Sequence, residues 1–371
     1  MQRSCVMILA ITTLVLGGAG YSPAGAADTN WASYRGSPQM SGATGAFTDR
    51  PRLLWTYDTG SEIESTAAIV GDTVYVGTRN NALLALRLSD GKLKWKYMAG
   101  DAISASPLVV GETVSVGDEG GVFHAVNALT GQRRWHFTTG DKIISSATRA
   151  GGAVLVGSYD NYLYKLDAIS GAKVWSFKSG AQVHCSPCVV GSLVAIAGCD
   201  GYVRAVGLHD GEEKASASVG GNFAVAPAYA SGAVFVGSMD GEYASVRLSD
   251  GHILWKTMVR KNGGASYGSA AVSGNSVVFP SRNHTVFCLN RATGQTRWIF
   301  TTGDEVDSSP AIAGNRVFFG ADDGKVRSVD LATGKGVWEF SAGARIMASP
   351  AIGCGCMVIG TSDGAIYCFG K

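Results

Sequence analysis

Short runs of apolar and β-branched residues recur along the chain with a period of 40 residues, and glycine-containing turns separate them. Residues 73–77 (Thr-Val-Tyr-Val-Gly) form one such run, and residues 163–166 (Leu-Tyr-Lys-Leu) form another in a later period. Each period holds four runs with alternating side-chain character and four turns. This pattern predicts a four-stranded antiparallel sheet in every period.

One tryptophan marks almost every period. The series is Trp55, Trp95, Trp135, Trp175, Trp255, Trp298 and Trp338, with Ala215 at the phase between Trp175 and Trp255. The interval is 40 residues, except for the 43 residues from Trp255 to Trp298. A large aromatic residue at a fixed phase indicates packing, so we expect these side chains to lie between neighbouring sheets with their indole N–H groups on backbone acceptors.

Eight sheets of this kind predict an all-β fold, an eight-bladed β-propeller closed into a ring. The last period stops at its third run, residues 366–369, and has no fourth run of its own. Residues 52–55 (Arg-Leu-Leu-Trp) resemble a fourth run and are predicted to complete the last blade. The predicted propeller therefore covers residues 52–371, after a lead-in at residues 27–51.

The N-terminal residues 1–26 are typical of a signal peptide. Arg3 precedes an apolar segment at residues 5–16, which is shorter than the roughly 20 residues of a spanning helix, and Ala24-Gly25-Ala26 fits a cleavage site. A lipoprotein needs a cysteine just after the apolar segment. The only early cysteine, Cys5, stands at the start of that segment, so no lipid anchor is expected. The sequence thus predicts a periplasmic or secreted protein without a transmembrane anchor. The net charge of +2 gives no electrostatic reason to expect nucleic acid as a partner.

The residues around the tryptophans resemble a known motif. Residues 125–135 (Ala-Val-Asn-Ala-Leu-Thr-Gly-Gln-Arg-Arg-Trp) and 328–338 are similar to the tryptophan-docking motif of the pyrroloquinoline-quinone (PQQ) repeat superfamily, and residues 31–36 resemble its N-terminal lead-in. The resemblance implies the propeller fold. It does not imply one activity, because the superfamily contains enzymes and non-enzymes.

Two branches of the superfamily imply different functions. The PQQ- and calcium-dependent dehydrogenases use an adjacent Cys-Cys pair, and the chain has none. The chain also resembles the other branch, the outer-membrane assembly factor BamB and similar non-catalytic propellers, but it lacks the lipoprotein cysteine of BamB. We therefore expect a monomeric scaffold that binds an envelope protein or peptide and carries no cofactor. The alternatives are a PQQ-dependent oxidoreductase, with PQQ and calcium, and a sensor of a small ligand or sugar.

The candidate binding residues lie at two phases of the repeat. In a four-stranded blade, the residues nine and seven positions after each tryptophan should surround one mouth of the central channel. With the three-residue insertion after Trp255 allowed for, these phases include six candidates: Glu64, Lys142, His184, Tyr267, Asp307 and Arg345. Variable residues on a rigid frame are typical of binding surfaces. Glu64, His184 and Asp307 could also act as acid–base groups, or simply line a hydrated channel; no catalytic or metal-ligating residue is assigned.

The cysteines allow a disulfide prediction. Cys185 and Cys199 stand on either side of a turn near Gly191, which would place them near a cross-strand pair, and we expect them to form a disulfide. His184, Cys185, Cys188 and Cys199 together have the composition of a zinc site. Zinc is disfavoured because neighbouring residues on a strand point to opposite faces. Cys288 and Cys368 occupy a phase of small residues and are predicted to be buried free thiols.

Overall fold

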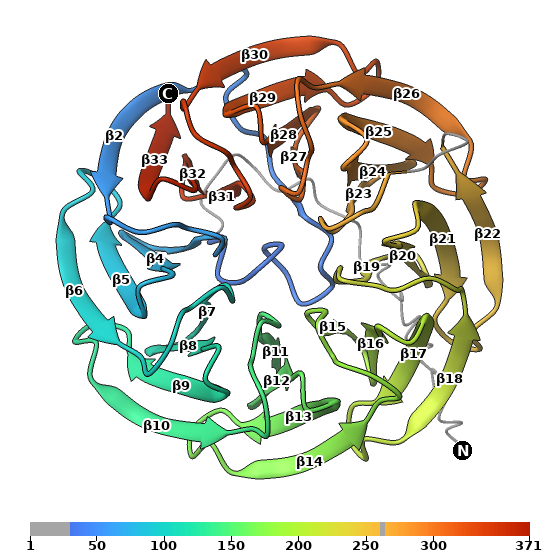
Figure 1. Ribbon diagram of the computed structural model, residues 1–371, viewed down its shortest axis with the longest axis horizontal. Coiled ribbons are helices and arrows are strands. Elements are labelled where there is room, and N and C mark those ends of the chain that lie inside the picture. The colour runs from blue at the N-terminus through green and yellow to red at the C-terminus, as the bar shows by residue number, and fades with distance from the viewer. Residues whose placement is uncertain (1–29, 260–263) are drawn as a thin grey trace, which may run out of the picture.

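The structure is a computed structural model that describes residues 30–259 and 264–371; the predicted signal peptide lies outside the described residues. The described chain forms 33 strands in eight sheets, which are arranged in a closed ring (Figure 1). The predicted all-β, eight-bladed propeller is confirmed. Within the described ranges, no helix could cross a membrane.

Each blade runs from a short inner strand to a long outer strand. The first four complete blades are β3 (Ala68–Val70), β4 (Thr73–Gly77), β5 (Ala82–Arg87) and β6 (Leu93–Met98); β7 (Leu108–Val110), β8 (Thr113–Gly117), β9 (Val122–Asn127) and β10 (Arg133–Thr138); β11 (Thr148–Ala150), β12 (Ala153–Gly157), β13 (Tyr162–Asp167) and β14 (Lys173–Lys178); and β15 (Cys188–Val190), β16 (Leu193–Ala197), β17 (Tyr202–Gly207) and β18 (Glu213–Ser218).

Three further blades follow the same order, and the last is assembled from both parts of the chain. They are β19 (Ala228–Ala230), β20 (Ala233–Gly237), β21 (Glu242–Arg247) and β22 (Ile253–Met258); β23 (Ala271–Ser273), β24 (Ser276–Ser281), β25 (Thr285–Asn290) and β26 (Thr296–Thr301); β27 (Ala311–Ala313), β28 (Arg316–Gly320), β29 (Lys325–Asp330) and β30 (Gly336–Ser341), with β1 (Ala43–Thr44) added in parallel to β27; and β31 (Ala351–Gly353), β32 (Cys356–Gly360), β33 (Ala365–Gly370) and β2 (Arg52–Asp58).

Six of the seven tryptophans in the series dock their strand onto the next blade with the predicted indole hydrogen bond. The Trp55 indole N–H donates to the Leu88 carbonyl at 2.7 Å, and its ring lies against Gly91, where an added Cβ would come within 2.6 Å of the ring. Gly91 also has a φ of +71°, a conformation that favours glycine. The same indole-to-carbonyl bond is made by Trp95, Trp135, Trp175, Trp255 and Trp298.

Two details of the docking differ from the simplest expectation. Only Trp55 and Trp298 of the docked tryptophans are buried; Trp95, for example, is half-buried on the outer rim. Where Ala215 replaces tryptophan, Gly251 of the next blade approaches the backbone of Ser216, and an added Cβ would lie 2.4 Å from its carbonyl oxygen. Backbone contact therefore replaces ring contact at this one junction.

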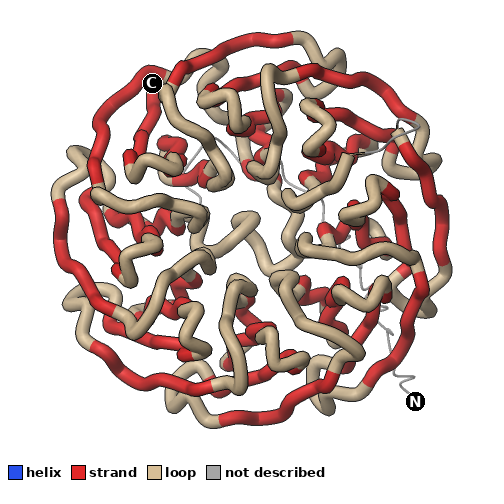
Figure 2. The backbone as a smooth tube through the Cα atoms, in the orientation of Figure 1, coloured by secondary structure: helices blue, strands red, loops and turns tan. Residues whose placement is uncertain are grey.

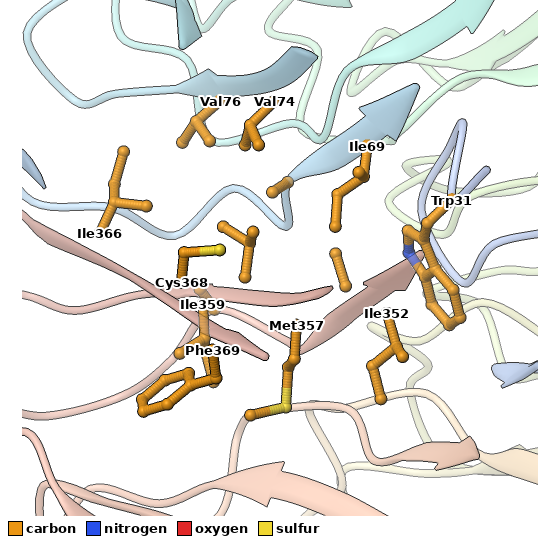
Figure 3. Packing of buried hydrophobic residues seen from close by; sticks show 14 of the residues in the cluster. Trp31, Ile69, Val74, Val76, Ile352, Met357, Ile359, Ile366, Cys368 and Phe369 are labelled. Atoms are coloured by element: carbon orange, nitrogen blue, oxygen red, sulfur yellow. The ribbon is translucent and has the colours of Figure 1, made fainter. Parts of the chain in front are cut away.

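The ring closes through the predicted strand. β2 pairs antiparallel with β33, with Trp55 opposite Cys368. The seam is filled by apolar side chains from the first and last blades, and Figure 3 shows Ile366 and Cys368 of β33 beside Val74 and Val76 of β4. Because one blade needs both ends of the propeller sequence, folding of the ring depends on strands that are far apart in the chain.

A belt of hydroxyl groups joins the inner strands around the channel. In seven junctions, a backbone N–H donates to a side-chain hydroxyl of the next blade at 2.9–3.3 Å. The pairs are Thr66 to Ser106, Ser106 to Ser146, Ser146 to Ser186, Ala226 to Ser269, Ser269 to Ser309, Ser309 to Ser349 and Ser349 to Thr66. The belt is interrupted where Ala226 offers no hydroxyl to Ser186.

Candidate functional site

The lead-in closes one end of the channel. Residues 31–44 cross the centre of the ring (Figures 1 and 2), and their carbonyl groups accept hydrogen bonds from inner-strand N–H groups of six blades. The donor and acceptor residues are Ile69 and Trp31, Val109 and Ala32, Val189 and Pro38, Tyr229 and Gln39, Val272 and Ser41, and Ile312 and Gly42. The channel is therefore blind, with the lead-in as its floor.

Two neighbouring residues of the lead-in fix this floor. Arg35 is fully buried and donates to the backbone carbonyls of Ala270, at 3.0 Å, and of Pro310. Its burial lowers the pKa of the guanidinium to about 10. Tyr34 faces the channel, and its hydroxyl is 2.8 Å from the hydroxyl of Ser309 in the belt. The floor is thus bonded to the same blades that line the wall.

Above the floor lies a cup of about 200 Å³ that opens at the opposite mouth. All eight positions nine residues after each tryptophan phase line it, as predicted, with Tyr267 at twelve residues because of the three-residue insertion: Glu64, Ser104, Ile144, His184, Ala224, Tyr267, Asp307 and Met347. Four of the six candidate residues, Glu64, His184, Tyr267 and Asp307, are in this set. The structure confirms where these residues lie and does not test what they bind.

The other two candidates lie at the rim, outside the wall of the cup. Lys142 places its ammonium group 4.5 Å from the centre of the Tyr159 ring. Arg345 has a side chain that is 57% exposed and pairs with Asp322 at 2.6 Å. Each of these two residues therefore contacts another side chain at the rim and does not line the cup.

A second set of rim residues was missed in the sequence. Arg79, Glu119, Tyr159, Arg282 and Asp322 each follow the second strand of a blade and reach the mouth beside a predicted residue. Each is held there by its backbone N–H, which donates to a carbonyl of the preceding mouth loop, as from Arg79 to Glu62 at 3.1 Å. The repeat contains a signal for this second set, because its residues share one phase, fifteen positions after the residues that line the cup.

On one side of the mouth, charged groups form a connected cluster. Arg79 bonds to Ser104 at 2.7 Å and to Glu119, and lies 3.7 Å from Glu64. Burial raises the pKa of the Glu64 carboxyl, and the charge of Arg79 opposes the shift. The sequence suggested Glu64 and Asp307 as acid–base groups. In the structure each of them lies beside a different arginine, Arg79 for Glu64 and Arg282 for Asp307.

A second cluster lies around His184. The Tyr159 hydroxyl is hydrogen-bonded to Nδ1 of His184 at 2.5 Å. Burial, with a contribution from the charge of Lys142, lowers the pKa of His184 to about 4, so the imidazole is neutral at pH 7. A neutral histidine bound to a tyrosine offers a polar, uncharged surface to a ligand.

The third cluster surrounds Asp307. Arg282 forms a bidentate pair with Asp307 at 2.8 and 2.6 Å, and its guanidinium stacks 3.7 Å from the centre of the Tyr267 ring. The Asp307 side chain is only 6% exposed. The hydrogen bond to Asp307 raises the pKa of Arg282 above its usual range, so the guanidinium keeps its proton.

The predicted Cys185–Cys199 disulfide is absent; both residues are free thiols. Strand β15 begins only at Cys188, so Cys185 lies beyond the paired part of the hairpin. Its sulfur accepts the Ala197 N–H, while the Cys199 thiol points to the Phe223 carbonyl of the next blade. Cys288 and Cys368 are buried free thiols, as predicted.

The fold and the blind cup define the class of protein: a tryptophan-docking propeller whose central cup opens at one face. The family of the outer-membrane protein assembly factor BamB matches residues 45–150, 138–270 and 260–369. The chain belongs to this family. No curated protein sequence matches the chain.

Solved structures share the fold at low sequence identity. BamB from Moraxella catarrhalis superposes with a TM-score of 0.76 at 18% identity, covering 86% of this chain and all of that one. The quinohemoprotein alcohol dehydrogenase from Comamonas testosteroni gives 0.81 at 14% identity, covering 92% and 81%. A europium-containing methanol dehydrogenase gives 0.79 at 14%, covering 92% and 98%. These similarities establish the fold and do not separate the scaffold from the enzymes.

Proposed function

We propose that this protein is a non-catalytic, exported scaffold of the cell envelope that binds a protein or peptide partner at the open mouth. The blind cup carries the proposal. Its volume of about 200 Å³ is below the roughly 300–1,000 Å³ of pockets that enclose small molecules. A cup of this size suits one or two side chains of a partner that rests on the rim.

The chemistry of the rim supports the same proposal. The arginine in the cup wall, Arg282, is already bound on two sides by Asp307. A carboxylate-bearing cofactor such as PQQ would have to displace Asp307 in order to use this arginine, so the residues present do not fit that cofactor well. Tyr267, stacked on Arg282, instead provides a rigid aromatic surface of the kind enriched at protein interfaces.

Capture of partners from envelope extract tests the proposal. The bait is the wild-type protein, a rim variant with Tyr267→Ala and Met347→Ala, or the control Leu129→Ala, whose side chain is 76% exposed in the turn after β9. We expect a partner that is retained by the wild type and the control and lost by the rim variant. Equal retention by all three baits would contradict the proposed surface.

An activity assay tests the alternative function directly. The same preparation is supplied with PQQ and calcium and assayed for alcohol-dependent dye reduction. We expect no PQQ-dependent rate above that of a heat-denatured sample. A PQQ-dependent rate that is lost in the rim variant would replace the scaffold with an oxidoreductase.

A further inference from the structure

Three carboxylates of one blade converge beside the cup. Glu305 and Asp307 lie in the loop before β27, and Asp322 follows β28; one oxygen from each lies within 4.8 Å of the others. The two loops are joined by a backbone hydrogen bond from Asp322 N–H to the Glu305 carbonyl at 2.9 Å. The backbone therefore holds the three side chains in one place.

One oxygen of this group has no partner. The Asp322 side chain is 4% exposed, and both contacts from Arg345, at 2.6 and 3.0 Å, go to Oδ2. Oδ1 is buried and accepts no hydrogen bond. A buried carboxylate oxygen without a partner is costly, so such an atom points to a missing ligand.

We propose that Glu305, Asp307 and Asp322 bind a divalent cation, with calcium as the ion of best fit. Hard cations take oxygen ligands, and calcium accepts several carboxylates in a flexible geometry, whereas magnesium usually binds one or two carboxylates and keeps most of its water. Three carboxylate oxygens that lie within 4.8 Å of one another therefore form a ligand set of the kind that calcium takes.

The local charges leave room for the ion. Three carboxylates face two guanidinium groups, because Arg282 pairs with Asp307 and Arg345 pairs with Asp322. This leaves one net negative charge, which a divalent cation converts to one net positive charge at the rim. Glu305 is 40% exposed, so water can reach the ion and complete its coordination. The bound ion fixes the two mouth loops of this blade relative to each other.

Calorimetry on the full exported chain, stripped of metal with a chelator and titrated with calcium chloride, tests the site. We expect one ion per chain with a dissociation constant of about 1 mM or below, the range of extracellular calcium modules. Asp322→Asn should weaken binding by about tenfold or more, because a charged ligand is lost. No calcium binding at concentrations up to about 10 mM would overturn the proposal.

Matched variants separate the site from general charge effects. Asp304→Asn makes the same change one residue away, at a side chain that caps the Glu305 N–H and lies outside the three carboxylates. We expect calcium affinity to stay near that of the wild type. Glu305→Gln changes an exposed ligand, and should weaken binding even if Asp322→Asn does not fold. Equal losses in Asp304→Asn and Asp322→Asn would overturn the site.

A proton is the competing partner for Oδ1. If Asp322 is protonated, Asp322→Asn leaves thermal stability unchanged with or without calcium, and that result would also reject the cation. The partner-binding proposal is independent of this outcome, since calorimetry needs no partner and the rim variants of the capture experiment change none of the three carboxylates.

Discussion

The two ends of the channel are built by different means. The closed end is made by residues 31–44, whose backbone carbonyls bond to six blades, with Arg35 fully buried among carbonyl oxygens. The open end is made by side chains that pair with one another across loops, as Arg282 does with Asp307 and Tyr159 with His184. Backbone hydrogen bonds and the buried Arg35 hold the floor, whereas contacts between side chains form the rim.

This difference teaches where the protein can change. A substitution in the floor disturbs bonds that connect several blades, so it should affect folding of the whole ring. A substitution at the rim removes one contact on a frame that stays intact, so it should change recognition more than stability. The predictions below test that division.

The largest effect is expected from removing the lead-in and the closing strand together. Deletion of residues 27–56 takes away the floor and most of β2, and leaves β33 as an unpaired edge. We expect loss of cooperative unfolding, measured by circular dichroism and calorimetry. A truncated chain that melts as the wild type does would show that the ring closes without these residues.

The next prediction compares the loss of stability when one positively charged side chain is removed at each end of the channel. Arg35→Ala removes the donors to several buried carbonyls and leaves a cavity, so we expect a loss of about 3 kcal/mol or more in the free energy of unfolding. Lys142→Ala removes a cation–π contact at the rim and should cost about 0.5–1 kcal/mol. Urea unfolding measures both, and equal losses would contradict the division between floor and rim.

A pH effect is expected from His184 at the open end. Its pKa is about 4 in the folded chain, below the ordinary value of 6.5, so its contribution to stability is complete above pH 6.5 and declines as the pH falls toward 4. His184→Gln should lack this decline. Melting temperatures of both proteins between pH 7 and pH 4 check it, and parallel curves would mean that His184 is not buried as described.

Small effects are expected in the hydroxyl belt between the two ends. Ser106→Ala leaves the buried Thr66 N–H without an acceptor and should cost about 1–2 kcal/mol. Ala226→Ser supplies the missing hydroxyl for Ser186 and should add about 0.5–1.5 kcal/mol of stability. Urea midpoints with unchanged slopes would support both; a destabilising Ala226→Ser would mean that the site has no room for the oxygen.

The frame could be predicted closely because each structural element repeats. The phase of Trp55 predicted its docking bond, and the missing fourth run of the last period predicted the pairing of β2 with β33. The same phase placed all eight wall residues of the cup. The second set of rim residues, which includes Arg282 and Asp322, was not predicted, because only their shared phase in the repeat marks them and their residue types differ from blade to blade.

The sequence by itself determined the number of blades, their phase and the ring of mouth positions, since a repeat imposes the same local geometry wherever it occurs. Only the tertiary structure decided how the two channel ends differ. Whether residues 31–44 cross the channel, whether Arg79 meets Glu64, and whether Cys185 meets Cys199 are not repeated features. Each depends on the distance between segments that are far apart in sequence, or on the residue at which strand pairing stops. Only the assembled ring fixes these distances.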